Sequence, residues 1–598
     1  MSSSLPVEVQ RHSIAHVMAA AIKRLIPEAK FGVGPVVEHG FYYDIDIGRG
    51  VTPEDVKAIQ KEMHHIINQN PAFTREELSI DDAIRLFTEL AQPYKVELLT
   101  DLKTKGTTKV SVEESQDIDP QNVGTVSVYR TGEFVDLCRG PHVTQAKDIG
   151  AWKLTKVAGA YWRGKSENPQ MQRIYGLCFS TQQELDAYET MMAEAEKRDH
   201  KKLGKELGLF TFSELVGPGL PLWTPKGTVI RTLLDSFVWQ LREEKGYQRV
   251  TIPHITKKDL YVKSGHWAKF SEELFRIVTR EGHEFAMKPM NCPHHTQIYD
   301  AEPRSYRDLP QRYAETTMVY RDEQSGELAG LSRVRSITQD DAHVFCRKNQ
   351  IEQEVLAIWD IIDQFYSTFG FELNIRLSLH DPEHFEKYLG TREIWKEAED
   401  QLRSVIVNRG LTYVEGVGEA AMYGPKIDFM GMDAIGRKHQ VATIQLDFNQ
   451  PEGFDLVCIN EQGERERIVM IHCAIMGSIE RFLSVLIEHY AGAFPLWLSP
   501  VQVMILPVAD RHIAYARELA QECAKRGLRA KVDDSAESVG KKIRSAEQGK
   551  SPVMLVVGDK EQESGELTVR RRGSADQVVI EREALLKQLA EETVGRRS

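Results

Sequence analysis

Hydrophobic positions along the chain repeat with two periods, and these periods predict both helices and strands. The clearest helix is the segment KGTVIRTLLDSFVWQLREEKG. Its apolar stripe runs from Val229 to Leu241, and Gly246 is placed to end it. A charged segment further upstream, QQELDAYETMMAEAEKRDHKKLGKEL, predicts a helical linker.

Strand-like runs follow the long helix. RYAETTMVYRDE and LSRVRSITQDDAHVF flank the loop QSGELAG and predict a hairpin. TIQLDF predicts another strand, and RIVMIHCAIMGSIERFLSVLIEHY begins as a strand and continues as a helix. The segment YQRVTIPHI is also β-rich. Because Pro253 cannot donate to a strand ladder, we expect that strand at an edge or an interface.

These patterns divide the chain into three predicted domains. Residues 1–195 mix helices and strands, and residues 196–497 contain the long helix and the hairpin. In residues 498–598 short apolar strands alternate with helices, so we expect a mostly parallel sheet covered by helices. The expected fold class is multidomain α+β and α/β.

Composition excludes some classes of protein. With 598 residues and 41% hydrophobic content, the chain can bury several cores. We find no apolar run long enough for a membrane span and no signal peptide. Seven scattered cysteines fit a reduced cytosol, so we expect a cytoplasmic protein. The net charge of −12 argues against a general polyanion binder.

The predicted hairpin carries a possible phosphate site. Arg321 and Glu323 lie two residues apart and would face the same side of a strand, as would Arg333 and Arg335. Arginine forks bind phosphate oxygens, and a carboxylate can accept a hydrogen bond from an adenine amino group. A cross-strand salt bridge is the alternative. Arg481, one turn into a helix that begins near Gly477, could reach the same anion.

The N-terminal region carries possible metal ligands. His12 and His16 lie one turn apart on a predicted helix, opposite an apolar stripe, so we expect them to face away from its apolar contact. Cys138 and His142 are four residues apart after a predicted strand. Taken together, the spacings predict a four-ligand zinc site.

Several motifs then indicate a family. GYQRVTIPHI, VYRDEQSG with RVRSITQDDAH, and MGSIERF resemble the three signature motifs of class II aminoacyl-tRNA synthetases, in order. PMNCPHH, TQDDAH, MYGPKIDF, IQLDF and VMIH resemble the threonyl members, and the likeness extends from Arg11 onward. It implies an antiparallel-sheet catalytic core, an α+β editing domain and an α/β anticodon-binding domain. It also implies a homodimer that uses ATP, L-threonine and tRNA(Thr).

The resemblance assigns roles in ATP binding. Arg321 would hold the α-phosphate, Arg333 and Arg481 the γ-phosphate, and Glu323 the adenine amino group. Lys426 would act at the reacting phosphate, and Mg²⁺ would accompany ATP. Catalysis would then rest on positioning and charge neutralisation. The nucleotide pocket would also include Gln440 and Thr443.

The resemblance further implies one zinc ion per subunit, held by Cys292, His343 and His472, which no spacing rule connects. Three protein ligands leave a position open for the amino and hydroxyl groups of threonine. Valine lacks the hydroxyl and would be rejected. The amino-acid pocket would comprise Met290, Gln339, Asp341, Tyr423 and Gln445.

Serine would pass this selection, because one methyl group discriminates by only about 1–3 kcal/mol. The segment RHSIAHVMAAAIKRL…GFYYDID…DLCRGPH resembles the editing domain of threonyl- and alanyl-tRNA synthetases. Two chemistries stay open for its cluster. The threonyl type would work without metal, and the alanyl type would bind zinc. The metal-free version, which we favour, adds Tyr43, Lys95 and Asp136 to the histidines.

In the C-terminal region the resemblance places Glu561 and Arg570 at positions expected to contact anticodon bases, with a surface ion pair as the alternative. Two departures from the family are visible. The chain begins almost directly at RHSIAH, so we expect the ubiquitin-like domain of many bacterial relatives to be absent. By the same resemblance, Ile337 stands where relatives carry an aromatic residue that stacks on adenine, so we expect ATP to bind without that stacking contribution.

Three other functions are weighed against the motifs. A non-enzymatic paralogue would typically lose motif arginines or metal ligands, which this chain retains. A synthetase for another amino acid, such as proline, should lack the cysteine–histidine trio. A free-standing editing hydrolase would lack the catalytic region.

Overall fold

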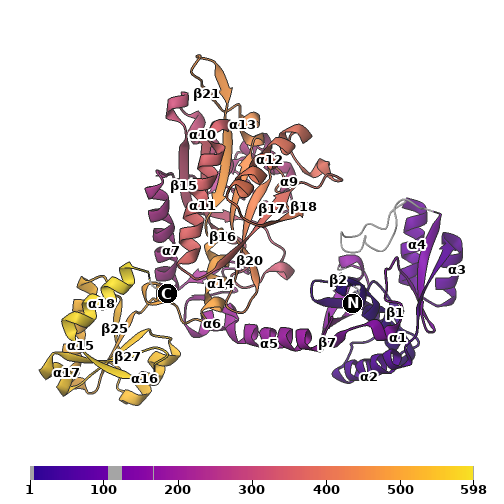
Figure 1. Ribbon diagram of the computed structural model, residues 1–598, viewed down its shortest axis with the longest axis horizontal. Coiled ribbons are helices and arrows are strands. Elements are labelled where there is room, and N and C mark those ends of the chain that lie inside the picture. The colour runs from indigo at the N-terminus through magenta and orange to yellow at the C-terminus, as the bar shows by residue number, and fades with distance from the viewer. Residues whose placement is uncertain (1–5, 106–123, 166, 575, 597–598) are drawn as a thin grey trace. The chain divides into compact units, whose positions relative to one another are not determined.

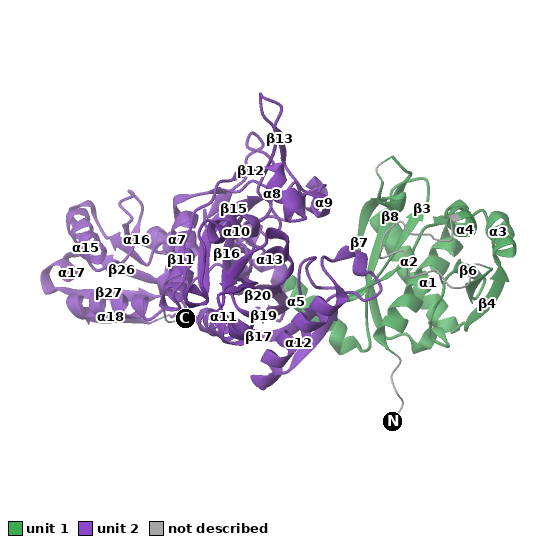
Figure 2. Cartoon of the chain, turned by 90° about the horizontal axis from the view of Figure 1, so that it is seen from above, with its two compact units in different colours: residues 1–193 green, residues 194–598 purple. Residues whose placement is uncertain are grey.

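The computed structural model describes residues 6–105, 124–165, 167–574 and 576–596, to which all structural statements refer. Contacts divide the chain into two compact units, Met1–Ala193 and Glu194–Ser598 (Figure 2). The three-domain division with boundaries at 195 and 497 stays a prediction. None of the helices in the described ranges combines the length and apolar character that a bilayer span requires.

The first unit is built around helix α1 (Val7–Leu25). The helix packs against α2 (Pro53–Gln69) and against a sheet of order β1-β3-β8-β7, with β2 paired to β3. Because neighbours surround α1, nearly every residue from Gln10 to Ile22 is buried. The expectation of histidines turned away from the apolar contact was therefore wrong for His16, which is 2% exposed. The strands are β1 (Lys30–Phe31), β2 (Val36–Val37), β3 (Gly40–Asp46), β7 (Ala151–Tyr161) and β8 (Gln170–Phe179).

A second layer of this unit is a three-stranded sheet of order β4-β5-β6 with two helices beside it. Ser79 ends β4 and caps the following helix by accepting a hydrogen bond from the Asp82 N–H. The elements are β4 (Phe73–Ser79), α3 (Ile80–Glu89), α4 (Pro93–Lys105), β5 (Thr125–Thr131) and β6 (Phe134–Leu137).

The predicted linker forms two helices, α5 (Gln182–Arg198) and α6 (His200–Glu206). They are separated at Asp199, whose side chain accepts from the Lys201 N–H and caps α6.

The second unit centres on an eight-stranded sheet of order β11-β15-β16-β23-β20-β19-β17-β18 (Figure 1). All pairs are antiparallel except the two edge pairs, β11·β15 and β17·β18. The strands are β11 (Gln248–Arg249), β15 (Gln311–Tyr320), β16 (Ser336–Cys346), β17 (Glu372–Leu379), β18 (Tyr413–Val417), β19 (Lys426–Met432), β20 (Lys438–Asp447) and β23 (Val469–Ala474).

Helices cover this sheet and complete the largest core. The predicted long helix is α7 (Pro225–Glu244), and Gly246 after its end has a φ of 78°. Buried side chains of α7 and of the apolar helix α11 join those of the sheet. The other helices of this region are α8 (Lys258–Lys263), α9 (His266–Lys269), α10 (Cys292–Asp300), α11 (Ile351–Ser367), α12 (Arg392–Asn408), α13 (Asn449–Phe454) and α14 (Ile479–His489).

The segment around Pro253 departs from the prediction of one strand. It forms β11 and, after a break that contains the proline, β12 (Ile255–Lys257). β11 is an edge strand, which agrees with the constraint that proline sets. The smaller sheets of this region comprise β9 (Phe210–Thr211), β10 (Leu222–Trp223), β12, β13 (Arg276–Val278), β14 (Glu284–Met287), β21 (Val457–Ile459) and β22 (Arg465–Arg467).

The C-terminal region forms a sheet of order β25-β24-β26-β27-β28 with its own core. Three strands are parallel, but β27 and β28 are antiparallel, so the expected mostly parallel sheet was only partly right. The connection from β26 to β27 is a short helix, and a parallel crossover needs a dozen or more residues. The elements are β24 (Val503–Pro507), α15 (Ile513–Lys525), β25 (Ala530–Val532), α16 (Val539–Gln548), β26 (Val553–Val557), α17 (Asp559–Ser564), β27 (Glu566–Arg571), β28 (Gln577–Glu581) and α18 (Arg582–Val594).

Candidate functional site

Strand β16 presents alternate side chains to the two faces of the eight-stranded sheet. Gln339, Asp341 and His343 share one face. β23 pairs with β16 so that His472 lies opposite His343, and β20 pairs with β23 so that Gln445 lies opposite His472. Strand pairing therefore brings predicted residues from three strands into one row.

The other face of β16 is fixed to α7. Arg242 Nη1 lies 2.5 Å from Asp340 Oδ1, and both side chains are almost completely buried. The second Asp340 oxygen accepts from two backbone N–H groups in the segment before α14. Nearer the start of α7, Arg231 Nη2 donates to Thr338 Oγ1 at 2.6 Å. These bonds hold β16 in place from behind the row of functional side chains.

Cys292, His343 and His472 converge and are all buried. Their ligand atoms lie within 4.8 Å of one another, and His343 Nε2 faces His472 Nδ1 at 3.1 Å. Burial lowers the pKa of His343, so its imidazole is neutral and keeps a lone pair. One thiol and two imidazoles form a donor set that zinc prefers. The three residues therefore fit the predicted metal.

Two residues that the sequence analysis missed orient these imidazoles. Asp447 Oδ2 lies 2.8 Å from His472 Nε2, so this nitrogen can donate to the carboxylate and leave Nδ1 as an acceptor. His343 Nδ1 lies 2.7 Å from His295 Nδ1 and can donate to it, which leaves His343 Nε2 as an acceptor. Spacing could have indicated both residues. Asp447 is two positions after Gln445 on a strand, and His295 is three after Cys292 on α10.

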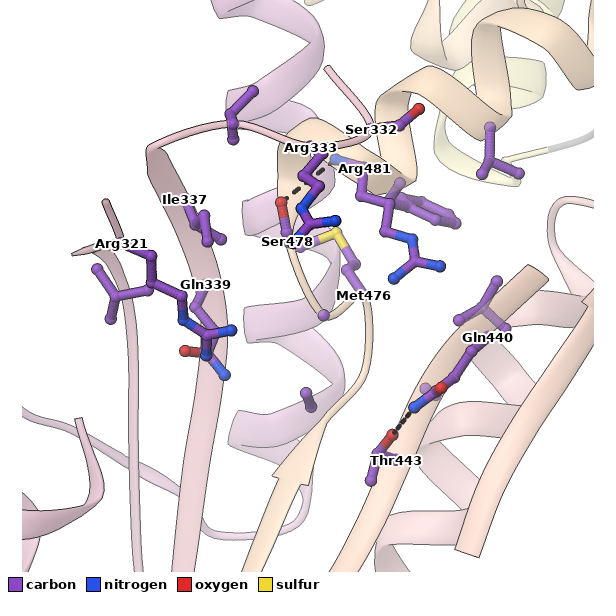
Figure 3. A pocket seen from close by; sticks show the side chains of 18 of the residues that line it. Arg321, Ser332, Arg333, Ile337, Gln339, Gln440, Thr443, Met476, Ser478 and Arg481 are labelled. Atoms are coloured by element: carbon purple, nitrogen blue, oxygen red, sulfur yellow. Dashed lines mark hydrogen bonds between the residues drawn. The ribbon is translucent and has the colours of Figure 1, made fainter. Parts of the chain in front are cut away.

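Next to this row lies a cavity of about 520 Å³. Figure 3 shows Arg321 and Gln339 on one wall, Gln440 and Thr443 on the opposite wall, and two arginines between them. Ile337 also lines the cavity. The predicted residues among its lining are Arg321, Glu323, Arg333, Gln339, Gln440, Thr443 and Arg481.

The hairpin itself was predicted correctly, because β15 pairs with β16 from Gln311 opposite Phe345 to Tyr320 opposite Ser336. The predicted strand positions of its charged residues were wrong. Arg321 and Glu323 follow β15, and Arg333 precedes β16. Arg333 Nε nevertheless donates to Glu323 Oε2 at 2.7 Å, so the alternative salt bridge is present. Regular pairing stops there because the backbone N–H groups of Asp322 and Arg335 donate to Glu273 and Gly219, which lie outside the hairpin.

Lys426 lies outside the cavity lining, at the start of β19. Its Nζ is 2.9 Å from Asp428 Oδ2, a carboxylate that is fully buried and that the sequence analysis missed. The other oxygen of Asp428 accepts from Gln440 Nε2 at 2.8 Å and from Thr443 Oγ1 at 2.9 Å. Asp428 thus links Lys426 to the predicted nucleotide residues.

The remaining predicted amino-acid residues surround the cysteine–histidine trio. The ring centroid of Tyr423 is 4.9 Å from that of His472. Asp341 accepts a hydrogen bond of 2.9 Å from Asn291, which precedes Cys292. The same neighbourhood contains the buried Gln445 and the half-buried Met290.

A second cluster lies in the first unit, where α1 meets the loop after β6. The ligand atoms of His12, His16, Cys138 and His142 lie within 4.8 Å of one another. Cys138 Sγ is 3.2 Å from His12 Nε2 and 3.2 Å from His142 Nε2. Burial lowers the pKa of both His16 and His142, so neutral rings are favoured. Three imidazoles and a thiol could hold zinc.

The other predicted editing residues adjoin this cluster. Lys95 Nζ lies 2.6 Å from Asp136 Oδ1, and the Tyr43 hydroxyl donates to Asp136. Asp136 Oδ2 lies 3.6 Å from His16 Nε2. Because Asp136 contacts a lysine, a phenol and an imidazole, the network can orient water and move a proton without a metal. The structure therefore brings all seven predicted residues together and is compatible with both chemistries.

The two predicted anticodon residues lie on neighbouring elements. Glu561 on α17 accepts from the Gly558 N–H at 3.0 Å and from Thr568 Oγ1 at 2.7 Å. Thr568 and Arg570 are two residues apart on β27, so Glu561 and Arg570 lie on one side of that strand. The next residue, Arg571, pairs with Glu592 at 2.9 Å.

Family models match three parts of the chain. Residues 126–175 match the threonyl and alanyl tRNA synthetase second additional domain. Residues 275–490 match the tRNA synthetase class II core domain (G, H, P, S and T), and residues 502–592 match an anticodon binding domain.

Whole-chain comparisons extend these matches. The chain is 46% identical to the threonine–tRNA ligase of Cytophaga hutchinsonii and 48% identical to that of Deinococcus radiodurans, in each case over 94% of this chain and 85% of the relative. It is also similar to the crystal structure of the RNA binding domain of threonyl-tRNA synthetase from Cryptosporidium parvum. That match has a TM-score of 0.63 and 38% identity, and it covers 66% of this chain and 98% of that one.

Proposed function

This chain belongs to the threonyl-tRNA synthetase family, and from this premise we propose that it activates L-threonine with ATP and transfers it to tRNA(Thr). The threonine carboxylate attacks the α-phosphorus, which gives threonyl-adenylate and releases pyrophosphate. The ribose hydroxyl of the tRNA end then attacks the acyl carbon and releases AMP. The observation that carries the proposal is one sheet that joins an arginine-lined cavity to a cysteine–histidine trio.

The cavity supplies the electrostatics of activation. Arg321, Arg333 and Arg481 bring three positive charges to a site that would hold a triphosphate with Mg²⁺. The arginines orient and neutralise the phosphates, while Glu323 is placed to accept from the adenine amino group. Lys426, through Asp428, stabilises the wall formed by Gln440 and Thr443. We assign these residues to ATP on that geometry.

We further propose that Cys292, His343 and His472 hold one zinc ion per subunit. The fit rests on the two imidazole nitrogens that face each other beside the thiol, and on the hydrogen bonds that orient both rings. When bound, the zinc would offer an open position to the amino and hydroxyl groups of threonine. Asp341, Tyr423, Gln339, Gln445 and Met290 would then bind the rest of the amino acid.

The first unit supplies the second selection step. Its family match supports deacylation of mischarged tRNA, here seryl-tRNA(Thr). We propose the metal-free chemistry, in which His16, Asp136, Lys95 and Tyr43 orient the water and manage the proton of the leaving ribose hydroxyl. Cys138, His12 and His142 form the adjoining wall.

Assembly and RNA binding complete the proposal. In this class the first motif forms the two-fold interface, so we propose a homodimer through α7 and the segment of Pro253. Val229 and Leu233 of its apolar stripe are only partly covered within one chain, which supports this. Glu561 and Arg570 would contact the anticodon. We place the protein in the cytoplasm, where its seven buried thiols, none in a disulfide among the described residues, would stay reduced.

ATP–pyrophosphate exchange across the twenty amino acids tests the function. We expect strong exchange with threonine, weak exchange with serine and none with valine. Strong exchange with proline, or none with threonine, would contradict the proposal. Metal analysis tests the zinc site, because Cys292→Ser should lose the metal. Two zinc ions per wild-type chain would instead support metal in the first unit.

A further inference from the structure

His200, the first residue of α6, bonds two separate parts of the catalytic region. Its ring Nδ1 lies 2.6 Å from Glu488 Oε1, and its backbone N–H donates to the same oxygen at 3.1 Å. Its Nε2 accepts a hydrogen bond of 3.1 Å from the backbone N–H of Leu331. One buried imidazole thus joins α14, through Glu488, to the hairpin loop, through Leu331.

The hydrogen bonds define the form of this imidazole. Because Nε2 accepts from a backbone N–H, the ring proton must sit on Nδ1, where it donates to Glu488. Glu488 is held in turn by Arg437, whose Nη2 lies 2.6 Å from its second oxygen. Burial would raise the pKa of Glu488, but the hydrogen bonds from His200 and the charge of Arg437 keep it below its ordinary value. The carboxylate is therefore a fixed acceptor.

The loop is shaped to receive this side chain. Gly330 has a φ of 56°, and a Cβ at that position would collide with the His200 ring. Leu331 is fully buried in the core, and Ser332 Oγ lies 3.0 Å from Ser484 Oγ on α14. The loop residue before Arg333 is thus attached to the same helix.

The two elements that His200 joins carry the two arginines at one end of the cavity. Arg333 follows Leu331 by two residues, and Arg481 lies two helical turns before Glu488. Figure 3 shows Arg333 on the loop and Arg481 on the helix, beside each other. Arg333 is paired with Glu323, but the backbone positions from which Arg333 and Arg481 reach the cavity are set by the loop and by α14.

We propose that His200 is a positioning residue that fixes the hairpin loop to α14 and so presets the placement of Arg333 relative to Arg481 for the terminal phosphates of ATP. The residue contacts no substrate. It acts by preorganisation. If Arg333 and Arg481 are already in position, less free energy is spent on ordering them when ATP binds. The inference rests on the proposed function, since it assigns both arginines to ATP.

Two substitutions separate the two halves of the contact. His200→Gln keeps an acceptor close to the Nε2 position and loses the Nδ1 donor, whereas His200→Asn keeps a donor close to Nδ1 and loses the acceptor for Leu331. If the loop contact matters, Asn should behave like Ala and weaken ATP binding about tenfold, and Gln should stay closer to the wild type. Calorimetry with ATP alone measures this, without dependence on which amino acid is activated.

A double-mutant cycle tests whether the effect passes through Arg333. His200→Ala should weaken ATP binding and leave the KM for threonine unchanged, and in an Arg333→Ala background it should cost no further ATP affinity. The matched control is Arg198→Ala, which removes a 3.0 Å bond from the linker to the last turn of α14 but does not touch the loop. Its ATP affinity should equal that of the wild type.

Three results would overturn the inference: unchanged ATP affinity in His200→Ala, additive losses in the cycle, or Asn closer to the wild type than Gln. The proposed function is tested separately by wild-type exchange with threonine. A wild type that fails this exchange removes the function. An active wild type with unaffected His200 variants removes only the positioning role.

Discussion

Replacing Asp447 by Asn should weaken zinc binding at the proposed site without changing any of its three proposed ligands. One carboxylate oxygen accepts from the Asn449 and Gln450 backbone N–H groups, at 2.8 and 3.0 Å. The other lies 2.8 Å from His472 Nε2. An asparagine that keeps its oxygen toward the backbone must point its NH₂ group at His472, where a donor then faces a donor. The clash disappears if the His472 proton moves from Nε2 to Nδ1. Nδ1 is the nitrogen that would bind the metal, so a proton there blocks coordination.

The magnitude follows from the bonds that change. Losing a charge-assisted hydrogen bond costs about 1.5–3 kcal/mol, and each 1.4 kcal/mol is about tenfold in Kd. Partners of this kind typically change metal affinity by about 10–100-fold. We therefore expect zinc to bind about 10–100-fold more weakly in Asp447→Asn, with the fold intact because the backbone contacts survive.

The assay is competition for zinc with a chromogenic chelator, followed by circular dichroism to confirm the fold. Asp455→Asn is the matched control, because that aspartate is exposed and pairs only with surface arginines. It should bind zinc like the wild type. If Asp447→Asn keeps wild-type affinity, or if both variants lose zinc equally, the account of how His472 is oriented is wrong.

Four further predictions follow from other parts of the molecule. Arg321→Ala and Arg481→Ala should each reduce pyrophosphate exchange by orders of magnitude, since they remove phosphate charge neutralisation, and a twofold loss would contradict their assignment. The variant His12→Ala/His16→Ala should still activate threonine but accumulate seryl-tRNA, with unchanged zinc content, and loss of one zinc per chain would show that the cluster binds metal. Sedimentation at micromolar concentration should give a dimer mass, and a monomer would contradict the interface assigned to α7. Burial raises the pKa of the Cys178 thiol to about 12, so it should resist iodoacetamide near pH 8 until the protein is unfolded, and rapid native labelling would contradict its burial.

The sequence predicts those structural features that are set by residues close together along the chain. The α7 stripe, the hairpin and the strand-to-helix change at Arg481 are local patterns, and the structure contains all of them. The strand ends around Arg321 and Arg333 were wrong, because loop hydrogen bonds rather than residue type decide where pairing stops. The mostly parallel sheet expected for the C-terminal region was only partly right, because the short connection before β27 allows only an antiparallel return.

In the candidate sites, too, contacts between residues far apart in sequence could not be predicted from local patterns. Cys292, His343 and His472 could be grouped only through the family likeness, because the two histidines meet by the pairing of β16 with β23 and the cysteine comes from the start of α10. Asp428, two residues after Lys426 on β19, could have been indicated by that spacing, whereas His200 has no spacing signal, since its partners come from other elements. Family motifs identify the residues expected to contact substrate. A residue such as His200, which holds those groups in place from another element, can be identified only in the folded structure.

The row of side chains across β16, β23 and β20 also makes metal binding at the proposed site depend on the correct register of these strands. A slip of one residue in the pairing of β23 would send His472 to the opposite face and bring Ile471 or Cys473 toward the site. A misaligned sheet would therefore lack one imidazole and could not capture the ion with the correct set of donors. Because bound metal stabilises only the register that assembles all three, mass action would draw misregistered chains back to the native pairing. The proposed zinc ion would then favour the native strand register as well as threonine.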